Sequence, residues 1–63
     1  MEQLKMTMTT WADRKLIVKN YPDDDDVNIE IVDERQQRTM ATYLTRPQLR
    51  DLIKFLEEIE NNS

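Results

Sequence analysis

The feature that most constrains this chain is a change in the spacing of its apolar residues at Thr45. Before Thr45, apolar and polar side chains alternate in four short runs, which is the pattern of β-strands that are buried on one face. These runs are about 4–11, 15–21, 27–32 and 38–44. After Thr45, apolar residues recur three or four positions apart from Leu49 to Ile59, which is the pattern of an amphipathic helix.

The start of the predicted helix is marked by a capping box. Thr45 is followed three residues later by Gln48, and Pro47 falls in the first turn, where its missing N–H is no loss. We therefore expect a helix over about 46–60. Because short connections favour a meander, the whole chain, 1–63, is predicted to be one small α+β domain. Its four-stranded antiparallel sheet would pack on the C-terminal helix as two layers. The sheet face expected beneath the helix carries Leu4, Leu16, Ile29 and Met40.

The chain contains no glycine, which bears on how the strands are connected. Two-residue hairpins depend on glycine at left-handed positions, so we expect longer connections of type I geometry. Pro22 and the four aspartates after it should end the second strand and form an exposed loop.

Histidine and cysteine are both absent, and this excludes several classes of chemistry. The usual zinc sites, disulfides and Ser-His or Cys-His nucleophiles cannot form. Two carboxylates could in principle act as the acid and base of a glycosidase, but 63 residues leave little depth for a cleft. We therefore expect a non-catalytic protein without cofactor or metal.

The four consecutive aspartates form the most concentrated charge in the sequence. They are Asp23, Asp24, Asp25 and Asp26. Together with Glu30 and the acidic residues of the helix tail (Glu57, Glu58 and Glu60), they could attract a basic or nucleic-acid-binding protein surface and imitate a phosphate backbone. The net charge of −4 argues against direct binding of nucleic acid. The simpler alternative is a solvated loop.

A calcium loop is a further reading of this segment, because Glu34 is the twelfth residue counted from Asp23. However, Val27 occupies the fifth position and Asn28 stands where the turn glycine is required. The pattern therefore does not support a calcium site.

Strand alternation also predicts which side chains point away from the helix. They include Ala41 and five larger side chains that we take as the candidate partner-binding residues: Trp11, Ile17, Tyr21, Val32 and Tyr43. Exposed apolar and aromatic groups of this kind are typical of protein interfaces, either with a foreign partner or in a homodimer. Alternatively, Trp11 and Tyr43 could wrap around the sheet edge and cover the helix ends.

The closing segment from Tyr43 to Leu56, the small size and the strand meander give the chain a family resemblance. It resembles the small, acidic, cysteine-free accessory proteins of bacteriophages and mobile elements, of which anti-CRISPR and other anti-defence inhibitors are examples. The resemblance implies a protein that binds a host macromolecular complex, often as a dimer, and blocks a surface. The alternative is an assembly subunit whose sheet face serves only homo-oligomerisation.

Two absences bear on location. No run approaches the ~18 apolar residues of a membrane span, and residues 1–10 lack the basic start and apolar centre of a signal peptide. We therefore expect no membrane contact and a cytoplasmic location, which would be the host cytoplasm for a phage protein.

Overall fold

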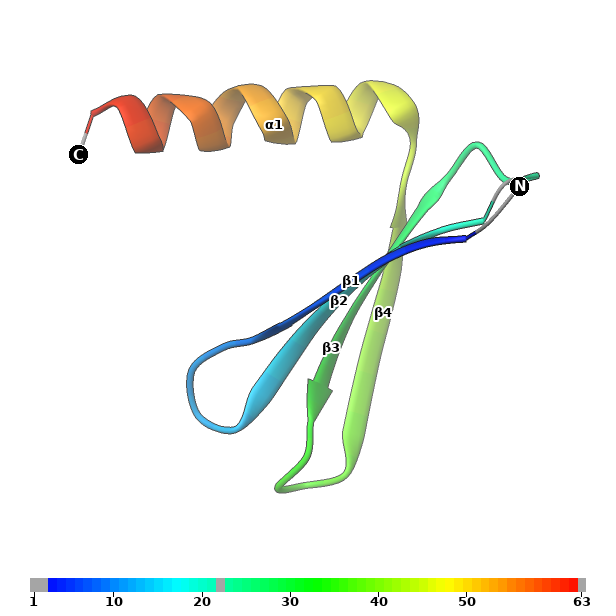
Figure 1. The fold of residues 1–63 in the computed structure, drawn as a ribbon, viewed down its shortest axis with the longest axis vertical. Helices are drawn as coiled ribbons and strands as arrows, with labels where there is room; N and C mark the ends of the chain where they lie inside the picture. The colour runs from blue at the N-terminus through cyan, green and yellow to red at the C-terminus, as the bar shows by residue number, and fades with distance from the viewer. Residues whose placement is uncertain (1–2, 22, 63) are drawn as a thin grey trace.

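The computed structural model describes residues 3–21 and 23–62, and in it four strands are followed by one helix (Figure 1). The elements are β1 Leu4–Thr9, β2 Arg14–Asn20, β3 Val27–Asp33, β4 Arg38–Leu44 and α1 Arg46–Asn61. The predicted α+β class, the four-stranded antiparallel sheet and the C-terminal helix are confirmed. Pro22, expected to end the second strand, lies outside the described residues.

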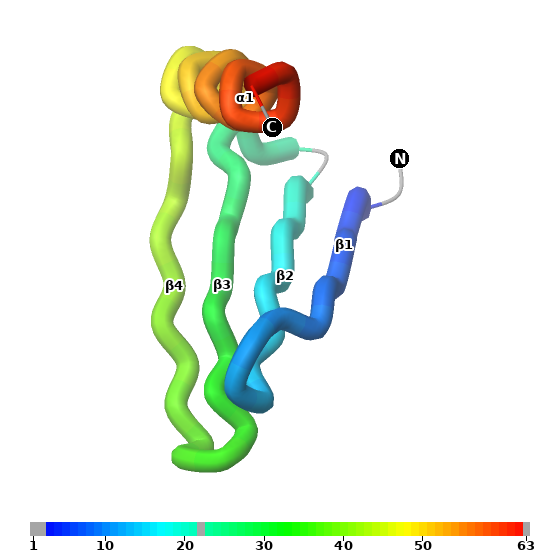
Figure 2. Tube along the Cα trace, turned by 90° about the vertical axis from the view of Figure 1, so that its left-hand side faces the viewer, coloured from blue at the N-terminus to red at the C-terminus, as the bar shows by residue number. Residues whose placement is uncertain are grey.

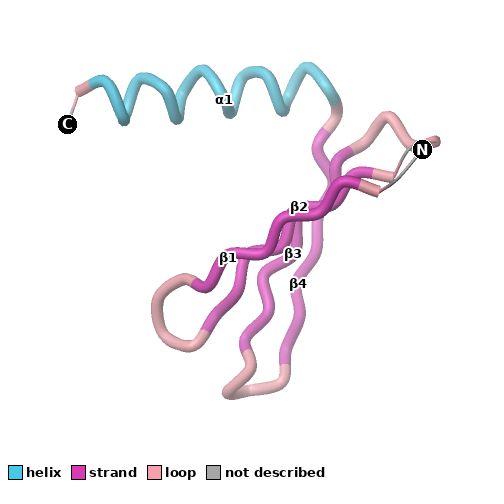
Figure 3. Tube along the Cα trace, in the orientation of Figure 1, coloured by secondary structure: helices cyan, strands magenta, loops and turns pink. Residues whose placement is uncertain are grey.

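The sheet is a meander in which each strand pairs antiparallel with its neighbour in the order β1-β2-β3-β4 (Figure 3). Val18 lies opposite both Met6 and Ile29, and Ile31 lies opposite both Leu16 and Met40. Directly paired residues point to the same face of a sheet, so this register gathers the apolar residues on one side. We call it the inner face: Leu4, Met6, Met8, Leu16, Val18, Val27, Ile29, Ile31, Met40 and Leu44. The opposite side is the outer face.

Two predicted strand ends are wrong. β1 ends at Thr9, so that Trp11 lies in the turn after it, and β2 ends at Asn20, so that Tyr21 lies beyond the strand. Alternation continues by chance through residues that are already turning. β3 and α1 each extend one residue further than expected, to Asp33 and Asn61.

The connections between strands are longer than two residues, as the lack of glycine predicts, but the first is not simply of type I. Ala12 and Asp13 are both left-handed, with φ of 60° and 59°, and Gln37 in the β3–β4 connection has φ of 53°. Left-handed turn residues match the right-handed twist of paired strands. The strand twist therefore outweighs the ~1–2 kcal/mol that a β-carbon costs in this conformation.

The helix begins as predicted, with both halves of the capping box formed. The Gln48 N–H donates to the Thr45 hydroxyl at 3.4 Å, and the Thr45 N–H donates to the Gln48 side chain at 3.0 Å. Thr45 is also the only residue between β4 and α1. So short a link limits how closely the helix can fold back over the sheet.

The helix consequently projects from the end of the sheet on the inner side and diverges from it (Figures 1 and 2). No helical residue is buried, and Leu4 and Met40 of the inner face are 72% and 75% exposed. The expected burial of these two residues beneath the helix is therefore wrong for the single chain. Among the described residues, only Val27 and Asn28, at 3% and 6% exposure, are buried. Both lie where the sheet meets the helix.

Candidate binding surfaces

The predicted partner-binding residues are divided between the two ends of the sheet. The register places Ile17, Val32 and Tyr43 on the outer face, with Tyr43 paired to Asn28 near the helix. Tyr21 follows β2 at that same end, whereas Trp11 lies in the β1–β2 turn at the opposite end. Trp11 is 82% exposed and Tyr43 is 59% exposed, so neither covers a helix end. Their binding role stays a prediction, but they do not form one patch.

An ion pair occupies the centre of the outer face. The Lys19 Nζ lies 3.0 Å from the Glu30 Oε1, and the two side chains keep only 22% and 20% of their surface exposed. The pKa of Lys19 is raised, mainly by this hydrogen bond and against the opposing effect of partial burial. The negative charges that Glu30, Tyr21 and Tyr43 can carry add smaller effects in the same direction. Lys19 is thus held as a cation between two exposed tyrosines.

The pairing with Lys19 removes Glu30 from the predicted acidic surface, because its charge is neutralised within the sheet. The aspartate loop is folded on itself instead. The Asn20 side-chain amide donates to the backbone oxygens of Asp24 and Asp26, at 3.3 and 3.4 Å. The Asp26 N–H donates to the Asp24 Oδ1 at 3.0 Å.

The loop leaves Asp23, Asp24 and Asp25 exposed at the end of the sheet where α1 begins. The acidic residues of the helix tail lie toward the far end of α1, about 17 to 21 Å along the helix from Arg46 at 1.5 Å per residue (Figure 1). The loop and the helix tail therefore do not form the single acidic field expected from the sequence.

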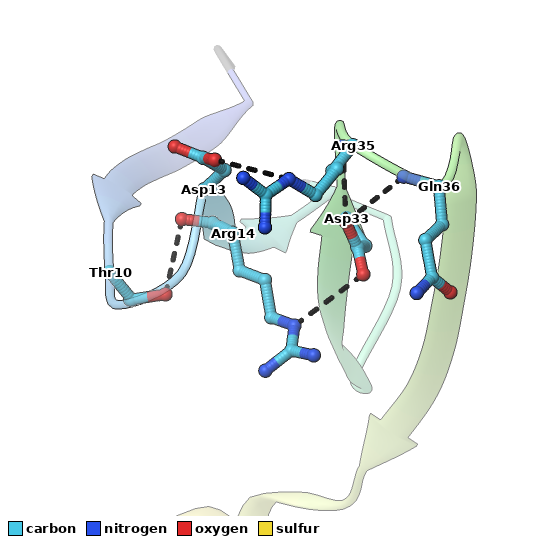
Figure 4. A network of polar contacts seen from close by, with 6 residues as sticks. All are labelled: Thr10, Asp13, Arg14, Asp33, Arg35 and Gln36. Carbon is cyan, nitrogen blue, oxygen red and sulfur yellow. Dashed lines mark hydrogen bonds and ion pairs between the residues drawn. The ribbon is translucent and has the colours of Figure 1, made fainter.

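A polar network fixes the turn that carries Trp11 (Figure 4). The Thr10 hydroxyl donates to the backbone oxygen of Arg14 at 3.1 Å, and the Arg14 Nε lies 3.6 Å from the Asp33 Oδ2. Asp33 also accepts from the backbone N–H groups of Arg35 and Gln36, at 3.1 and 3.2 Å. These contacts tie the β1–β2 turn to the β3–β4 turn.

The same two turns are joined directly as well. The Glu34 N–H donates to the Asp13 backbone oxygen at 3.4 Å, and the Arg35 Nε lies 3.9 Å from the Asp13 Oδ2. Lys15 and Glu34 form a further ion pair. Exposed ion pairs are individually weak, but together these contacts fix the turn from which the exposed side chain of Trp11 projects.

Most of the exposed large apolar side chains lie on a surface that the apolar pattern of the sequence assigns to the core. The inner face and the apolar stripe of α1 form the two sides of an open angle. Exposed on them are Leu4, Met6, Met8, Ile31 and Met40 of the sheet and Leu52, Ile53, Phe55, Leu56 and Ile59 of the helix. The signal that could have revealed this surface is the single-residue link at Thr45.

Several hollows lie along the inner face, and the two larger ones are at its ends. The first, of about 370 Å³, lies where the angle closes, between residues such as Met6, Val18 and Val27 and the first helical turn at Leu49. The second, of about 390 Å³, lies at the hairpin end, beside Ile31, Met40 and Arg38. Only the first hollow is bounded by both the sheet and the helix, whereas the second lies on the sheet alone.

Within 3–21 and 23–62, no group of three or more Asp or Glu side chains is placed to hold a metal ion. In the same part of the chain, no helix is both long and apolar enough to cross a membrane. Comparison of the sequence and fold with protein-family models, curated proteins and solved structures found no match. Function must therefore be argued from the surfaces themselves.

Proposed function

We propose that this chain is a non-catalytic protein-binding module that regulates or inhibits its partner by covering a surface. The observation that carries the proposal is the 82% exposure of Trp11 on a turn tied down by the Asp33 network. A turn that is already fixed loses little backbone freedom when its side chain binds, and tryptophan is among the most frequent anchors of protein interfaces. Tyr21 and Tyr43 supply a second anchor region on the outer face.

The partner surface should be basic. The chain carries a net charge of −4, and the exposed aspartates of the β2–β3 loop lie at the end of the sheet that also carries Tyr21 and Tyr43. Carboxylates beside aromatic anchors steer a basic surface into contact and repel nucleic acid. A cytoplasmic inhibitor of a nucleic-acid-binding complex, the role implied by the resemblance to phage anti-defence proteins, is the specific form of this proposal.

The proposal is tested by affinity capture with matched variants. Wild type, Trp11→Ala, Tyr43→Ala and a control, Lys54→Ala on the helix, are immobilised and exposed to one bacterial lysate. Proteins kept by wild type and by the control but lost from Trp11→Ala or Tyr43→Ala are purified, and their binding is measured by calorimetry. We expect each aromatic substitution to weaken binding at least tenfold. Identical retention by all four would refute the proposed surface.

A second candidate function is that of an assembly subunit, whose sheet serves only self-association. The exposed inner face favours it, because apolar surface of that extent is unusual on a protein that acts as a monomer. Under this second function the sheet binds only further copies of the chain and no foreign partner, so it is an alternative to the first function.

A further inference from the structure

We propose that a second copy of this chain fills the angle between the inner face and α1, so that two chains share one apolar core. This goes beyond the function proposed above, because it assigns a different surface to a defined occupant. A failed capture experiment would leave it untouched.

The first argument is the area that the single chain exposes. A folded chain of 7.6 kDa is expected to expose about 4,300 Å², whereas this chain exposes 5622 Å². The excess is about 1,300 Å² per chain, or about 2,600 Å² for a pair, which falls within the range of permanent homodimer interfaces. The uncovered surface is therefore of the size that one further copy can bury.

The shape of the chain leads to the same conclusion. Its radius of gyration is 13.3 Å, against about 10.6 Å for a compact domain of 63 residues. The expansion comes from the projecting helix (Figure 1). With Val27 as its only buried apolar residue among those described, the chain has almost no core of its own. Small domains without disulfides or metals commonly obtain the missing stability by association.

The two sides of the angle match each other in length. The strands β2, β3 and β4 each span seven residues, or ~23 Å, and α1 spans 16 residues, or ~24 Å. The helix of one copy can therefore lie along the full inner face of the other. A two-fold axis makes this exchange mutual, as in most homodimers, and leaves no apolar face unpaired.

The charges at the rim complement one another in this arrangement. Arg14, Asp33 and Arg38 lie beside the hollow at the hairpin end of the inner face. Because Asp33 is already paired with Arg14, it is Arg38 that leaves this end with a net positive charge. Glu57 and Glu58 lie in the last turns of α1, where the helix dipole is also negative. A partner helix laid with its C-terminus toward the hairpin end would bring these opposite charges together. A foreign occupant has no comparable support in the chain.

The first measurement is the mass of the purified full chain by light scattering. We expect twice 7.6 kDa at micromolar concentration. Leu56→Asp, on the apolar stripe, should give monomer or unfolded chain, whereas Lys54→Asp, on the opposite side of the helix, should remain dimeric. A wild-type chain that is folded and monomeric at 100 µM would overturn the proposal.

A second measurement locates the interface and does not depend on a disruptive substitution. Because the chain has no cysteine, a single thiol can be introduced by Met40→Cys on the inner face or by Tyr43→Cys on the outer face. In the single chain these positions are similarly open, at 75% and 59% exposure. We expect the thiol at position 40 to react at least tenfold more slowly, and dilution to monomer to remove the difference. Equal rates in a dimer would show that the copies meet elsewhere and would refute the shared core.

Discussion

The two faces of the sheet are built from the same four strands but differ in what they expose. The outer face carries paired polar groups, whereas the inner face carries uncovered apolar side chains. On the outer face, Ile17 is paired with Glu30, whose charge is balanced by Lys19. On the inner face, Ile31 lies between Leu16 and Met40, and no layer of the same chain covers Ile31 or Met40. The outer face is thus largely balanced within one chain, whereas the inner face is complete only when another surface covers it. Exposure in a single chain therefore does not by itself identify the surface that binds a foreign partner.

The largest expected effect tests this contrast with two adjacent residues of β3. Ile31→Asp places a carboxylate on the inner face, and Val32→Asp places one on the outer face. In the shared core, Ile31→Asp buries an unpaired charge, and we expect it to lower the free energy of unfolding by at least ~3 kcal/mol. For Val32→Asp we expect a loss of ~1 kcal/mol. Urea denaturation at several protein concentrations measures both.

Exposure in the single chain alone predicts the opposite result, namely that Val32→Asp lowers the free energy of unfolding more than Ile31→Asp does. Ile31 is 48% exposed, whereas Val32 is only partly exposed. If Val32→Asp is the more damaging substitution, or if wild-type stability does not depend on protein concentration, the contrast between the faces fails.

The sequence predicts the elements of this fold better than their arrangement. Strand alternation and the Thr45–Gln48 capping box are local signals, and both lead to the correct elements. The direction of α1 depends instead on the single link at Thr45 and on what covers the inner face. The latter is a property of the assembly, which an apolar pattern does not specify. The pattern shows that Leu4 and Met40 are suited to burial but does not show whose helix buries them.

The positions of the candidate binding residues were predictable from the sequence within the strands but not in the turns. Ile17, Val32 and Tyr43 lie on the outer face because parity within a regular strand is reliable. Trp11 and Tyr21 are misplaced because parity has no meaning once the chain turns. The alternation ends at Ala12 and Asp13, which adopt left-handed conformations. Because neither residue is glycine, the sequence gives no clear signal of this turn.

A smaller effect on stability is expected at Asn28, which is a polar residue of the outer face whose side-chain oxygen is unpaired. It is 94% buried, and its Oδ1 has no hydrogen-bond partner. An unsatisfied buried acceptor costs ~1–3 kcal/mol. We therefore expect Asn28→Val to raise the free energy of unfolding by ~1 kcal/mol in urea denaturation.

Asn20→Val is the matched control, because the Asn20 amide donates two hydrogen bonds to the aspartate loop. It should lower stability by a similar amount. A loss of stability in Asn28→Val as well would mean that Asn28 is satisfied in the assembled protein, and the outer face would then belong to an interface too.

The smallest effect is the pH dependence contributed by Lys19. Its pKa is raised by the hydrogen bond to Glu30, so the folded chain binds this proton more tightly than the unfolded chain does. The resulting stabilisation is fully present below the usual lysine value of 10.5 and is lost as pH rises through the higher folded value. Nitrogen NMR of the lysine ammonium groups between pH 9 and about 12 follows the titration directly. In Glu30→Gln the pKa of Lys19 should move down toward the usual value. The loss of stability caused by Lys19→Met should be smaller in the Glu30→Gln background than in the wild-type background. If Lys19 titrates the same way with and without Glu30, the ion pair does not balance the outer face, and the two faces differ only in their apolar content.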